Sequence, residues 1–260
     1  MSNKPKRAAA GSRVRPVPAV SRAIAILRLL GRARTPLGVK AIAESLEIVP
    51  STALHILRVL VSEQLVSLDP VSRKYGLGTG MLPLARAVLE NSGFRNIVQP
   101  ELDLLSQRHG ITAIGVELSD LDHMLVVALS RAQAPVRMHV DVGSRFPALI
   151  SATGRCVAAF TGQPWSEVEK RFRALRWEDP PTYESWCREV DKARRHGFSI
   201  DRGNYIAGVT IAAVPILNAQ GTISHALAAV GLGSRLGREA SLALVRDMQR
   251  AAATVASQMI

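Results

Sequence analysis

The chain has 260 residues and a formal net charge of +12, and its hydrophobic content is 47%. This length suits two domains, since one domain takes about 100–150 residues, and the apolar content is sufficient for packed cores. The two cysteines, Cys156 and Cys187, exclude a disulfide framework and a four-cysteine zinc site. With no signal-peptide pattern and no apolar stretch of membrane-spanning length, the sequence predicts a cytoplasmic protein without a membrane partner.

The positive charge is concentrated near the N-terminus. Residues 1–80 hold 13 lysines and arginines against four acids, whereas the other residues have a net charge of only +3. Residues 1–18 mix basic and small residues without a hydrophobic period, which predicts a disordered basic arm. Such a field attracts polyanions such as nucleic acid. The alternative is a basic surface that serves solubility alone.

Residues 19–80 have the pattern of three helices followed by a hairpin. Ser21 is expected to cap a first helix in which Ile24, Leu27 and Leu30 form an apolar stripe. A second helix is predicted at 39–46, a turn at 47–49, and a third helix at 50–63 that begins with Pro50. Strands are predicted at 65–68 and 73–77. This order predicts a winged helix-turn-helix domain.

The third helix has two distinct faces. Its apolar face carries Ala53, Leu57, Leu60 and Val61, and its polar face carries Ser51, His55, Arg58 and Ser62. Such a helix can enter the major groove of DNA with its N-terminal residues nearest the bases. The candidate DNA-binding residues are Lys40, Ser51, Thr52, His55, Arg58, Arg73 and Lys74. The alternatives are an ordinary solvated face, or a helix-turn-helix that contacts only other proteins.

A linker helix is predicted at 81–93, with Leu82, Ala85, Val88 and Leu89 on one side, where it can also pair with a partner chain. Residues 94–260 then form a second domain. Its predicted helices are 97–109, 151–160, 164–175 and 238–259, and its predicted strands are 112–118, 124–129, 136–142, 206–217 and 223–232. Hairpins flanked by helices predict an α+β fold with an antiparallel sheet.

A candidate ligand site lies at the predicted helix 151–160. Ser151 precedes a first turn formed by Ala152, Thr153 and Gly154, whose small side chains leave the backbone amides accessible. A helix start offers unpaired N–H groups and partial positive charge, so it can hold a carboxylate. The alternative is an ordinary capped helix that packs closely through Gly154.

The sequence resembles the IclR-type bacterial transcriptional regulators from Val20 onward. The resemblance is carried by VSRAIAILRLL at 20–30, AIAESLEIVPSTALHILRVLVSEQLV at 41–66, YGLG at 75–78, VGSRFPALISATGRCVAAF at 142–160 and RRHGFSIDRGNYIAGVTIAAVPI at 194–216. It implies a C-terminal domain similar to GAF folds that binds a small molecule, and assembly into homodimers or homotetramers. His55 stands where the family commonly has arginine, and Asn204 replaces a usual acid.

The resemblance also implies which residues form the ligand pocket. They are the segment at 151–154, Asp201 opposite it, and Ile211, Ala228 and Val230 from the last two strands. Family members that bind small oxoacids tend to have cysteine and serine at the last three places. Because these are apolar here, the expected effector is a larger apolar molecule with one polar end, such as an aromatic or acyl carboxylic acid.

Other signals do not favour catalysis. The GLGTG segment at 76–80 lacks the strand context and the following acid of a nucleotide loop. The six histidines show no metal-ligand spacing, and no catalytic motif is present, so neither a cofactor nor a metal is expected. The sequence therefore predicts a ligand-responsive, DNA-binding regulator of a catabolic or metabolic operon and not an enzyme. The alternatives are a small-molecule enzyme with a basic adaptor domain, or a scaffold whose arm binds RNA.

Overall fold

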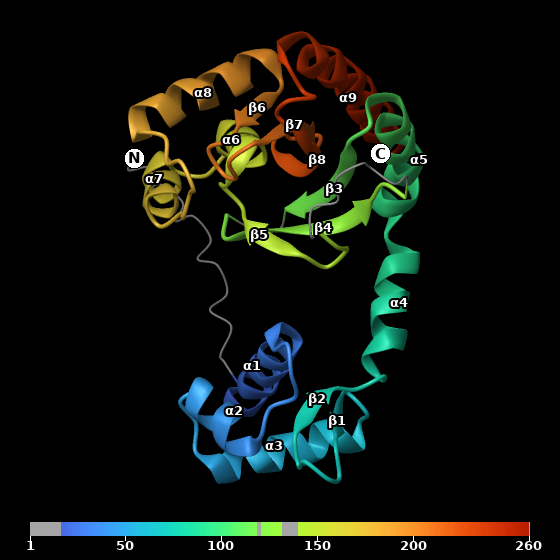
Figure 1. Cartoon of the computed structure of the whole chain (residues 1–260), viewed down its shortest axis with the longest axis vertical. Helices are drawn as coiled ribbons and strands as arrows, with labels where there is room; N and C mark the ends of the chain where they lie inside the picture. Colours follow the sequence, from blue (N-terminus) through green and yellow to red (C-terminus); the bar gives the residue numbers. More distant parts are fainter. Residues whose placement is uncertain (1–16, 119–120, 132–139, 260) are drawn as a thin grey trace, which may run out of the picture. The chain divides into compact units, whose positions relative to one another are not determined.

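The computed structural model describes residues 17–118, 121–131 and 140–259. The chain divides between Val88 and Leu89 into two compact units, which are coloured along the sequence in Figure 1. Residues 1–16 of the predicted basic arm lie outside the described residues. The predicted limits of the arm, the winged domain, the linker and the second domain therefore stay predictions.

The N-terminal unit contains three helices and a hairpin, with a fourth helix leading out of it. These elements are α1 (Pro18–Arg32), α2 (Val39–Ser45), α3 (Pro50–Ser62), β1 (Val66–Leu68), β2 (Tyr75–Leu77) and α4 (Met81–Asn91). The strands β1 and β2 are antiparallel, and Leu37 adds a bridge to Tyr75. The winged helix-turn-helix is confirmed. Among the described residues no single helix is long and apolar enough to cross a membrane; α2 and α3 pass that test only as a bent pair.

The first helix differs from its prediction at two places. It begins at Pro18, and the amide of Ser21 donates to the Val17 carbonyl, so Ser21 lies within the first turn and is not its cap. Proline suits this first position because its missing N–H has no partner to lose there. The buried face carries Ile26 and Leu30, whereas Ile24 is 42% exposed. Of the predicted apolar stripe, Leu30 is buried and Leu27 packs against the core, so the stripe differs from the prediction only at Ile24.

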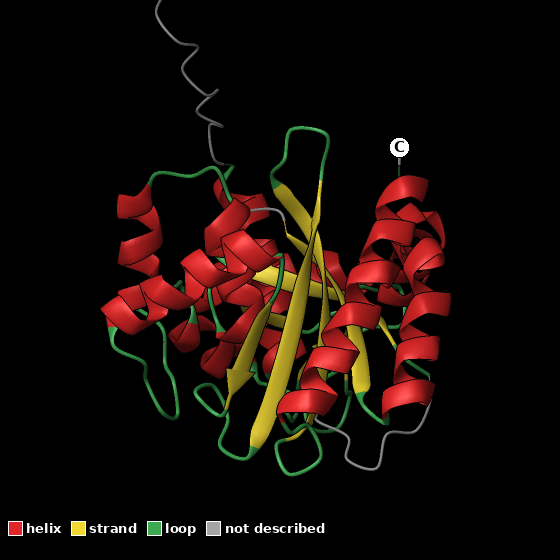
Figure 2. Ribbon diagram, turned by 90° about the horizontal axis from the view of Figure 1, so that it is seen from above, coloured by secondary structure: helices red, strands yellow, loops and turns green. Residues whose placement is uncertain are grey.

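The C-terminal unit is a six-stranded antiparallel sheet with helices on both faces (Figure 2). Its helices are α5 (Gly93–His109), α6 (Ser151–Phe160), α7 (Trp165–Arg173), α8 (Tyr183–His196) and α9 (Arg238–Gln258). Its strands are β3 (Thr112–Leu118), β4 (His123–Leu129), β5 (Arg145–Pro147), β6 (Ser199–Arg202), β7 (Val209–Leu217) and β8 (Ile223–Leu232), in the spatial order β5-β4-β3-β8-β7-β6. The predicted α+β class is confirmed.

Successive side chains along a strand point to opposite faces of the sheet, and each face packs in its own hydrophobic core. In β8, Leu227 and Ala229 face one core, and Ala228 and Val230 face the other. The first core is closed by α5 and α9, and the second by α6. The two buried faces explain why the strands are continuous apolar runs, since neither side is left for polar residues.

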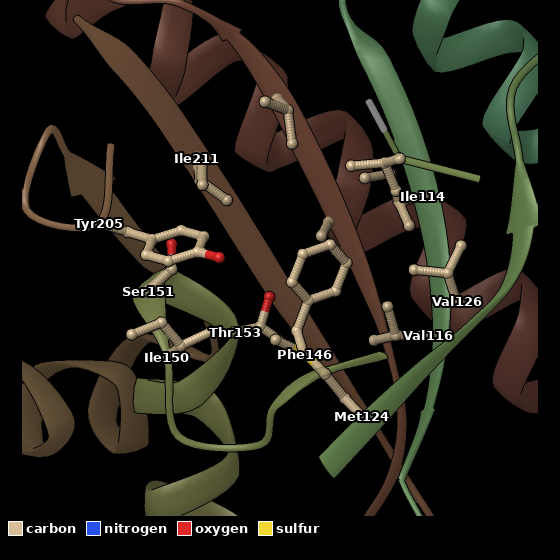
Figure 3. Close-up of a pocket in the computed structure, with 13 residues that line it drawn as sticks. Ile114, Val116, Met124, Val126, Phe146, Ile150, Ser151, Thr153, Tyr205 and Ile211 are labelled. Carbon is tan, nitrogen blue, oxygen red and sulfur yellow. The ribbon is translucent and has the colours of Figure 1, made fainter. Parts of the chain in front are cut away.

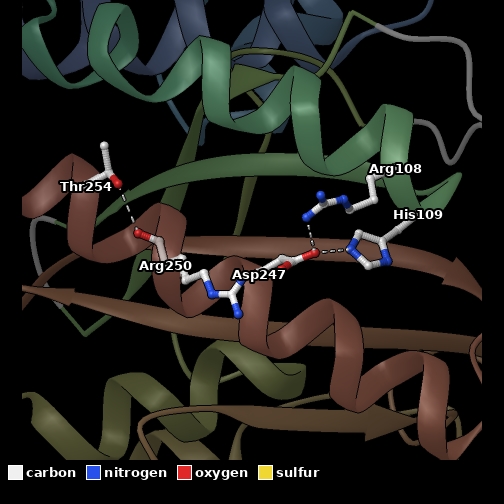
Figure 4. Close-up of polar contacts among 5 residues, drawn as sticks. All are labelled: Arg108, His109, Asp247, Arg250 and Thr254. Carbon is white, nitrogen blue, oxygen red and sulfur yellow. Dashed lines mark hydrogen bonds and ion pairs between the residues drawn. The ribbon is translucent and has the colours of Figure 1, made fainter.

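The pair of helices α5 and α9 is joined by an ionic cluster (Figure 4). The Asp247 carboxylate accepts hydrogen bonds from Arg108 at 2.9 Å and from His109 at 3.0 Å. These contacts hold the pKa of Asp247 below its usual range, the His109 bond contributing most. The cluster therefore joins the two helices that cover this face of the sheet.

Several local predictions for this unit were wrong. Residues 136–139 of the predicted strand 136–142 lie outside the described residues, and 140–142 are not in a strand. The strand that pairs with β4 is β5, which begins at Arg145. Helix α8 and strand β6 were not predicted, although α8 buries Trp186 completely. Helix α5 begins four residues before its predicted start, because the Ser92 hydroxyl caps it by accepting from the Arg95 amide.

Candidate functional site

Helices α2 and α3 are joined by a tight turn. The chain direction changes by 113° between them, which is within the range of about 90–120° of helix-turn-helix motifs. Glu47 allows this turn by adopting a left-handed conformation with φ of 52°, and Pro50 then begins α3 with a φ that is already helical. The turn therefore sets the angle between the two helices that a helix-turn-helix requires.

Helix α3 buries one face and exposes the other. Ala53, Leu57 and Leu60 are buried in the core of the unit, and burial of a leucine side chain contributes about 1.5–3 kcal/mol. The exposed face carries Ser51, His55, Arg58 and Ser62, as the spacing predicts. Thr52 is half-buried beside it. Hydroxyl, imidazole and guanidinium groups therefore share one solvent-facing stripe on a helix that the core holds in place.

The remaining basic candidates also lie on the surface of this unit. Lys40 on α2 is 88% exposed, with an ion pair of 3.9 Å to Glu44; such a surface pair contributes little and leaves Lys40 available. Arg73 and Lys74 are exposed in the turn before β2, not in a strand as predicted. At the base of this wing, a Cβ on Gly78 would lie 2.1 Å from the Gln64 carbonyl oxygen. Close packing therefore explains this glycine of the GLGTG segment.

The second site is a small cavity in the C-terminal unit, between the start of α6 and the sheet (Figure 3). Its volume is about 50 Å³. It is lined by Ile114, Val116, Met124, Val126, Val140, Phe146, Ile150, Ser151, Thr153, Tyr205, Ile211, Ala228 and Val230. All but three of these side chains are apolar, so the cavity favours an apolar ligand with a polar end.

The polar end of the cavity lies at Ser151. This residue is 3% exposed and has φ of 60°, a conformation that costs of order 1–3 kcal/mol for a residue other than glycine. Its hydroxyl has no hydrogen-bond partner. The hydroxyls of Thr153 and Tyr205 are nearby on the same wall (Figure 3), and burial raises the pKa of Tyr205. A strained, buried and unpartnered hydroxyl at a helix start is suited to a ligand oxygen.

The cavity brings together five of the eight predicted effector residues, namely Ser151, Thr153, Ile211, Ala228 and Val230. Ala152 and Gly154 are off its wall. Ala152 is fully buried in the core, and a Cβ on Gly154 would lie 1.9 Å from the Leu149 carbonyl carbon. Gly154 therefore serves close packing, which was the alternative interpretation of this segment.

Asp201 is also off the cavity wall. It is 1% exposed on β6 and lies 4.0 Å from the guanidinium of Arg155. Arg155 further donates to the Ile200 carbonyl at 3.0 Å and to the Asn204 side chain at 2.9 Å. Asp201 accepts from the Asn204 amide. The acid therefore joins β6 to the second turn of α6, and burial lowers the pKa of Arg155 despite this partner.

The sequence did not single out Phe146 and Tyr205 as wall residues. Phe146 belongs to β5 and Tyr205 to the loop after β6, and neither element was predicted. Cys156, one residue beyond Arg155, is fully buried and burial raises its pKa to about 12, which suits a core residue. Within the described part of the chain, no group of three metal-binding side chains is placed to hold an ion.

Comparisons with known proteins identify the two domains that carry the candidate sites. A model of the IclR helix-turn-helix domain matches residues 19–70, and a model of the bacterial transcriptional regulator IclR C-terminal domain matches residues 86–257. The HTH-type transcriptional regulator RhmR of Escherichia coli K12 is 28% identical over 247 residues, covering 90% of this chain and 93% of that protein. The HTH-type transcriptional repressor AllR of Salmonella typhi is 25% identical over 242 residues, covering 88% of this chain and 86% of its own length.

Solved structures show the same fold. An IclR transcriptional regulator from Alicyclobacillus acidocaldarius is 29% identical with a TM-score of 0.82, covering 94% of this chain and 99% of that one. An IclR homolog from Microbacterium hydrocarbonoxydans, in complex with 4-hydroxybenzoate, is 22% identical with a TM-score of 0.74, covering 92% of this chain and 98% of that one.

A winged helix-turn-helix followed by an α+β domain with a small cavity defines a DNA-binding transcriptional regulator with a ligand-binding domain. This chain belongs to the IclR family of bacterial transcriptional regulators, and it is a regulator rather than an enzyme. The resemblance found in the sequence is thereby confirmed.

Proposed function

We propose that the protein regulates a catabolic or metabolic operon by binding double-stranded operator DNA in the cytoplasm. The observation that carries this proposal is the exposed polar face of α3, on a helix whose other face is buried. In this arrangement Ser51 and Thr52 contact bases or phosphates, His55 contacts a base edge, and Arg58 contacts a phosphate. Lys40 contacts the DNA backbone, and Arg73 and Lys74 lie at the minor groove.

We expect Arg58→Ala to weaken DNA binding about tenfold at moderate salt, because one charged phosphate contact is lost. The slope of log affinity against log salt should fall in magnitude by about 0.9, the contribution of one phosphate. The measurement is fluorescence anisotropy with the promoter fragment of the protein's own gene. Arg176→Ala is the matched control, since Arg176 is exposed in the C-terminal unit. Equal binding by both variants would remove Arg58 from the interface.

We further propose that the effector is a small carboxylic acid with an aromatic or acyl body. The carboxylate would lie at Ser151 and the start of α6, and the body between Ile211 and Phe146. Support comes from the apolar wall and from the unpartnered Ser151 hydroxyl. The 4-hydroxybenzoate complex of a relative is consistent with an aromatic acid. A cavity of about 50 Å³ must widen for such a ligand, since benzene fills a cavity of about 150 Å³.

Calorimetry should show that benzoate binds more tightly than a compact oxoacid such as glyoxylate, because the larger acid buries more apolar surface. Ser151→Ala should weaken benzoate binding roughly tenfold or more, since a hydrogen bond to a charged group contributes about 1.5–3 kcal/mol. Ser166→Ala, at an exposed position on α7, is the control. Tighter binding of the oxoacid would contradict the proposed effector class.

Widening of the cavity can couple effector binding to DNA binding. Phe146 and Tyr205 are half-buried wall residues that can shift when a ligand enters. A ligand that binds the widened state better shifts the population toward it. In a homodimer or homotetramer this changes the packing of the C-terminal domains and the spacing of two winged helices on a pseudo-palindromic operator.

Helix α4 is the proposed surface for pairing with a second copy. Leu82, Ala85 and Val88 recur at a spacing of three on this helix and are all exposed in the single chain, Leu82 by 66% and Val88 by 70%. We expect the double variant Leu82→Glu and Val88→Glu to lower the mass measured by light scattering. Ala87→Glu places a glutamate away from this stripe and should leave the mass unchanged. An unaltered assembly of the double variant would exclude α4 from the interface.

A further inference from the structure

The tip of the wing, residues 69–74, is organised by one acidic side chain. The Asp69 carboxylate oxygen Oδ1 accepts hydrogen bonds from the Val71 amide at 2.9 Å, the Ser72 amide at 2.6 Å and the Ser72 hydroxyl at 3.0 Å. The backbone of Asp69 adds a bond to the Lys74 carbonyl and another from the Arg73 amide. Five hydrogen bonds of the turn therefore converge on Asp69.

This network holds a conformation that the chain does not favour on its own. Arg73 has φ of 55°, in the left-handed region that arginine rarely adopts. A strained residue persists only where its surroundings determine its conformation, and here the surroundings are the bonds to Asp69. Bonds from Ser72 and Val71 hold the pKa of Asp69 below its usual range, so the acceptor is anionic at neutral pH.

By its charge alone, Asp69 would weaken DNA binding. It is exposed in a turn that also carries Arg73 and Lys74, and a carboxylate near phosphates is repulsive. The turn nevertheless belongs to a region with 13 basic residues and four acids. Asp69 at the tip of a basic wing therefore affects DNA affinity in two opposite ways. Its hydrogen bonds order the turn, which strengthens binding, and its negative charge weakens binding.

We propose that Asp69 is a positioning residue for DNA recognition, which fixes the wing tip so that Arg73 and Lys74 meet the DNA backbone at the minor groove. This inference rests on the proposed binding of operator DNA. Preorganisation of the turn lowers the entropy cost of ordering the backbone that carries these two cationic side chains at the moment of binding. The gain is larger than the repulsion from one exposed carboxylate, which solvent and salt screen.

The test compares Asp69→Ala with Asp69→Asn in the full chain. Both variants remove the same charge, but asparagine keeps an acceptor oxygen at the Oδ1 position. Binding to the promoter fragment is measured by fluorescence anisotropy across a salt series. Asp69→Asn should bind at least as tightly as the wild type. Asp69→Ala should bind about tenfold more weakly, with a shallower salt dependence because phosphate contacts of the wing are lost.

Thermal unfolding checks that both variants fold. Should Asp69→Ala fail to fold, Ser72→Ala serves instead: it removes one donor to Asp69 and should weaken DNA binding by about two- to fivefold. Unchanged or tighter binding by Asp69→Ala, or by Ser72→Ala in its place, overturns the positioning role while leaving the proposed function intact. A wild-type protein that prefers no fragment of its genome overturns the proposed function and this inference with it.

Discussion

Gly154→Ala is expected to destabilise the C-terminal unit by at least about 3 kcal/mol, at the upper end of overpacking effects. The added Cβ would lie 1.9 Å and 2.0 Å from the carbonyl carbon and oxygen of Leu149. Both are backbone atoms, so the clash cannot be relieved by rotating a side chain. Helix α6 must shift or lose its first turn, which also displaces Ser151 from the cavity.

Tryptophan fluorescence during denaturant unfolding is a suitable measurement, because Trp165, Trp177 and Trp186 all lie in the C-terminal unit. Gly93→Ala is the matched control. No described atom lies within 4 Å of a Cβ at that position, and alanine there should stabilise the helix by about 0.4–1 kcal/mol. Similar unfolding midpoints for the two variants would contradict the prediction, because they would mean that the backbone at Leu149 can shift at little cost in stability.

The exposed polar face of α3, the candidate DNA-binding surface, could be predicted because its determinants are local. Within α3 the helical period alone decides that Leu57 is buried while His55 and Arg58 are exposed. The turn at 47–49 could also be predicted from neighbouring residues, because Pro50 marks the start of the next helix. Each of the helices α1, α2 and α3 of this small unit buries a single face, so the pattern of apolar residues carries most of the information.

The wall of the cavity, the candidate effector site, could be predicted only in part, because it joins residues distant in sequence. The alternation in β7 and β8 gives the inward direction of Ile211, Ala228 and Val230. The wall is completed by Phe146 and Tyr205, which lie on a three-residue strand and a loop. Neither segment has a period that sequence reasoning can detect.

Helix α8 was missed in the sequence for a different reason. Its buried residues Trp186, Val190 and Ala193 have the spacing i, i+4, i+7 of an amphipathic helix. The signal was present but is diluted by many charged residues along the helix. Strand β6 is harder to predict, because its two buried residues, Ser199 and Asp201, are both polar and one is an acid. Acids are almost never fully buried unless paired, and the partner Arg155 lies far away in the sequence.

Arg155→Met should therefore cost about 3–5 kcal/mol of stability, the usual effect of removing one partner of a buried ion pair. Asp201 would keep its charge in a site where it is 1% exposed, and Oδ2 already lacks a hydrogen-bond partner. The carbonyl of Ile200 and the side chain of Asn204 would each lose a donor as well. Denaturant unfolding, again followed by tryptophan fluorescence, measures the loss.

The double variant Arg155→Met and Asp201→Asn separates the charge from the packing. Asparagine at 201 removes the stranded charge and keeps an acceptor for the Asn204 amide, which lies 2.9 Å from Oδ1. Because neutral replacement of a buried pair is often tolerated, the double variant should recover most of the stability that Arg155→Met loses. Additive losses from the two substitutions would instead mean that the 4.0 Å contact contributes nothing.

The same set of variants tests whether the pair supports the cavity and the proposed effector binding. Ser151 and Thr153 on its wall lie less than two turns before Arg155 on the short helix α6. If the pair sets the position of α6 against β6, benzoate affinity should fall in Arg155→Met and recover in the double variant, in parallel with stability. Recovery of stability without recovery of affinity would show that the Arg155 hydrogen bonds, and not the neutralised charge of Asp201, hold Ser151 in its strained conformation.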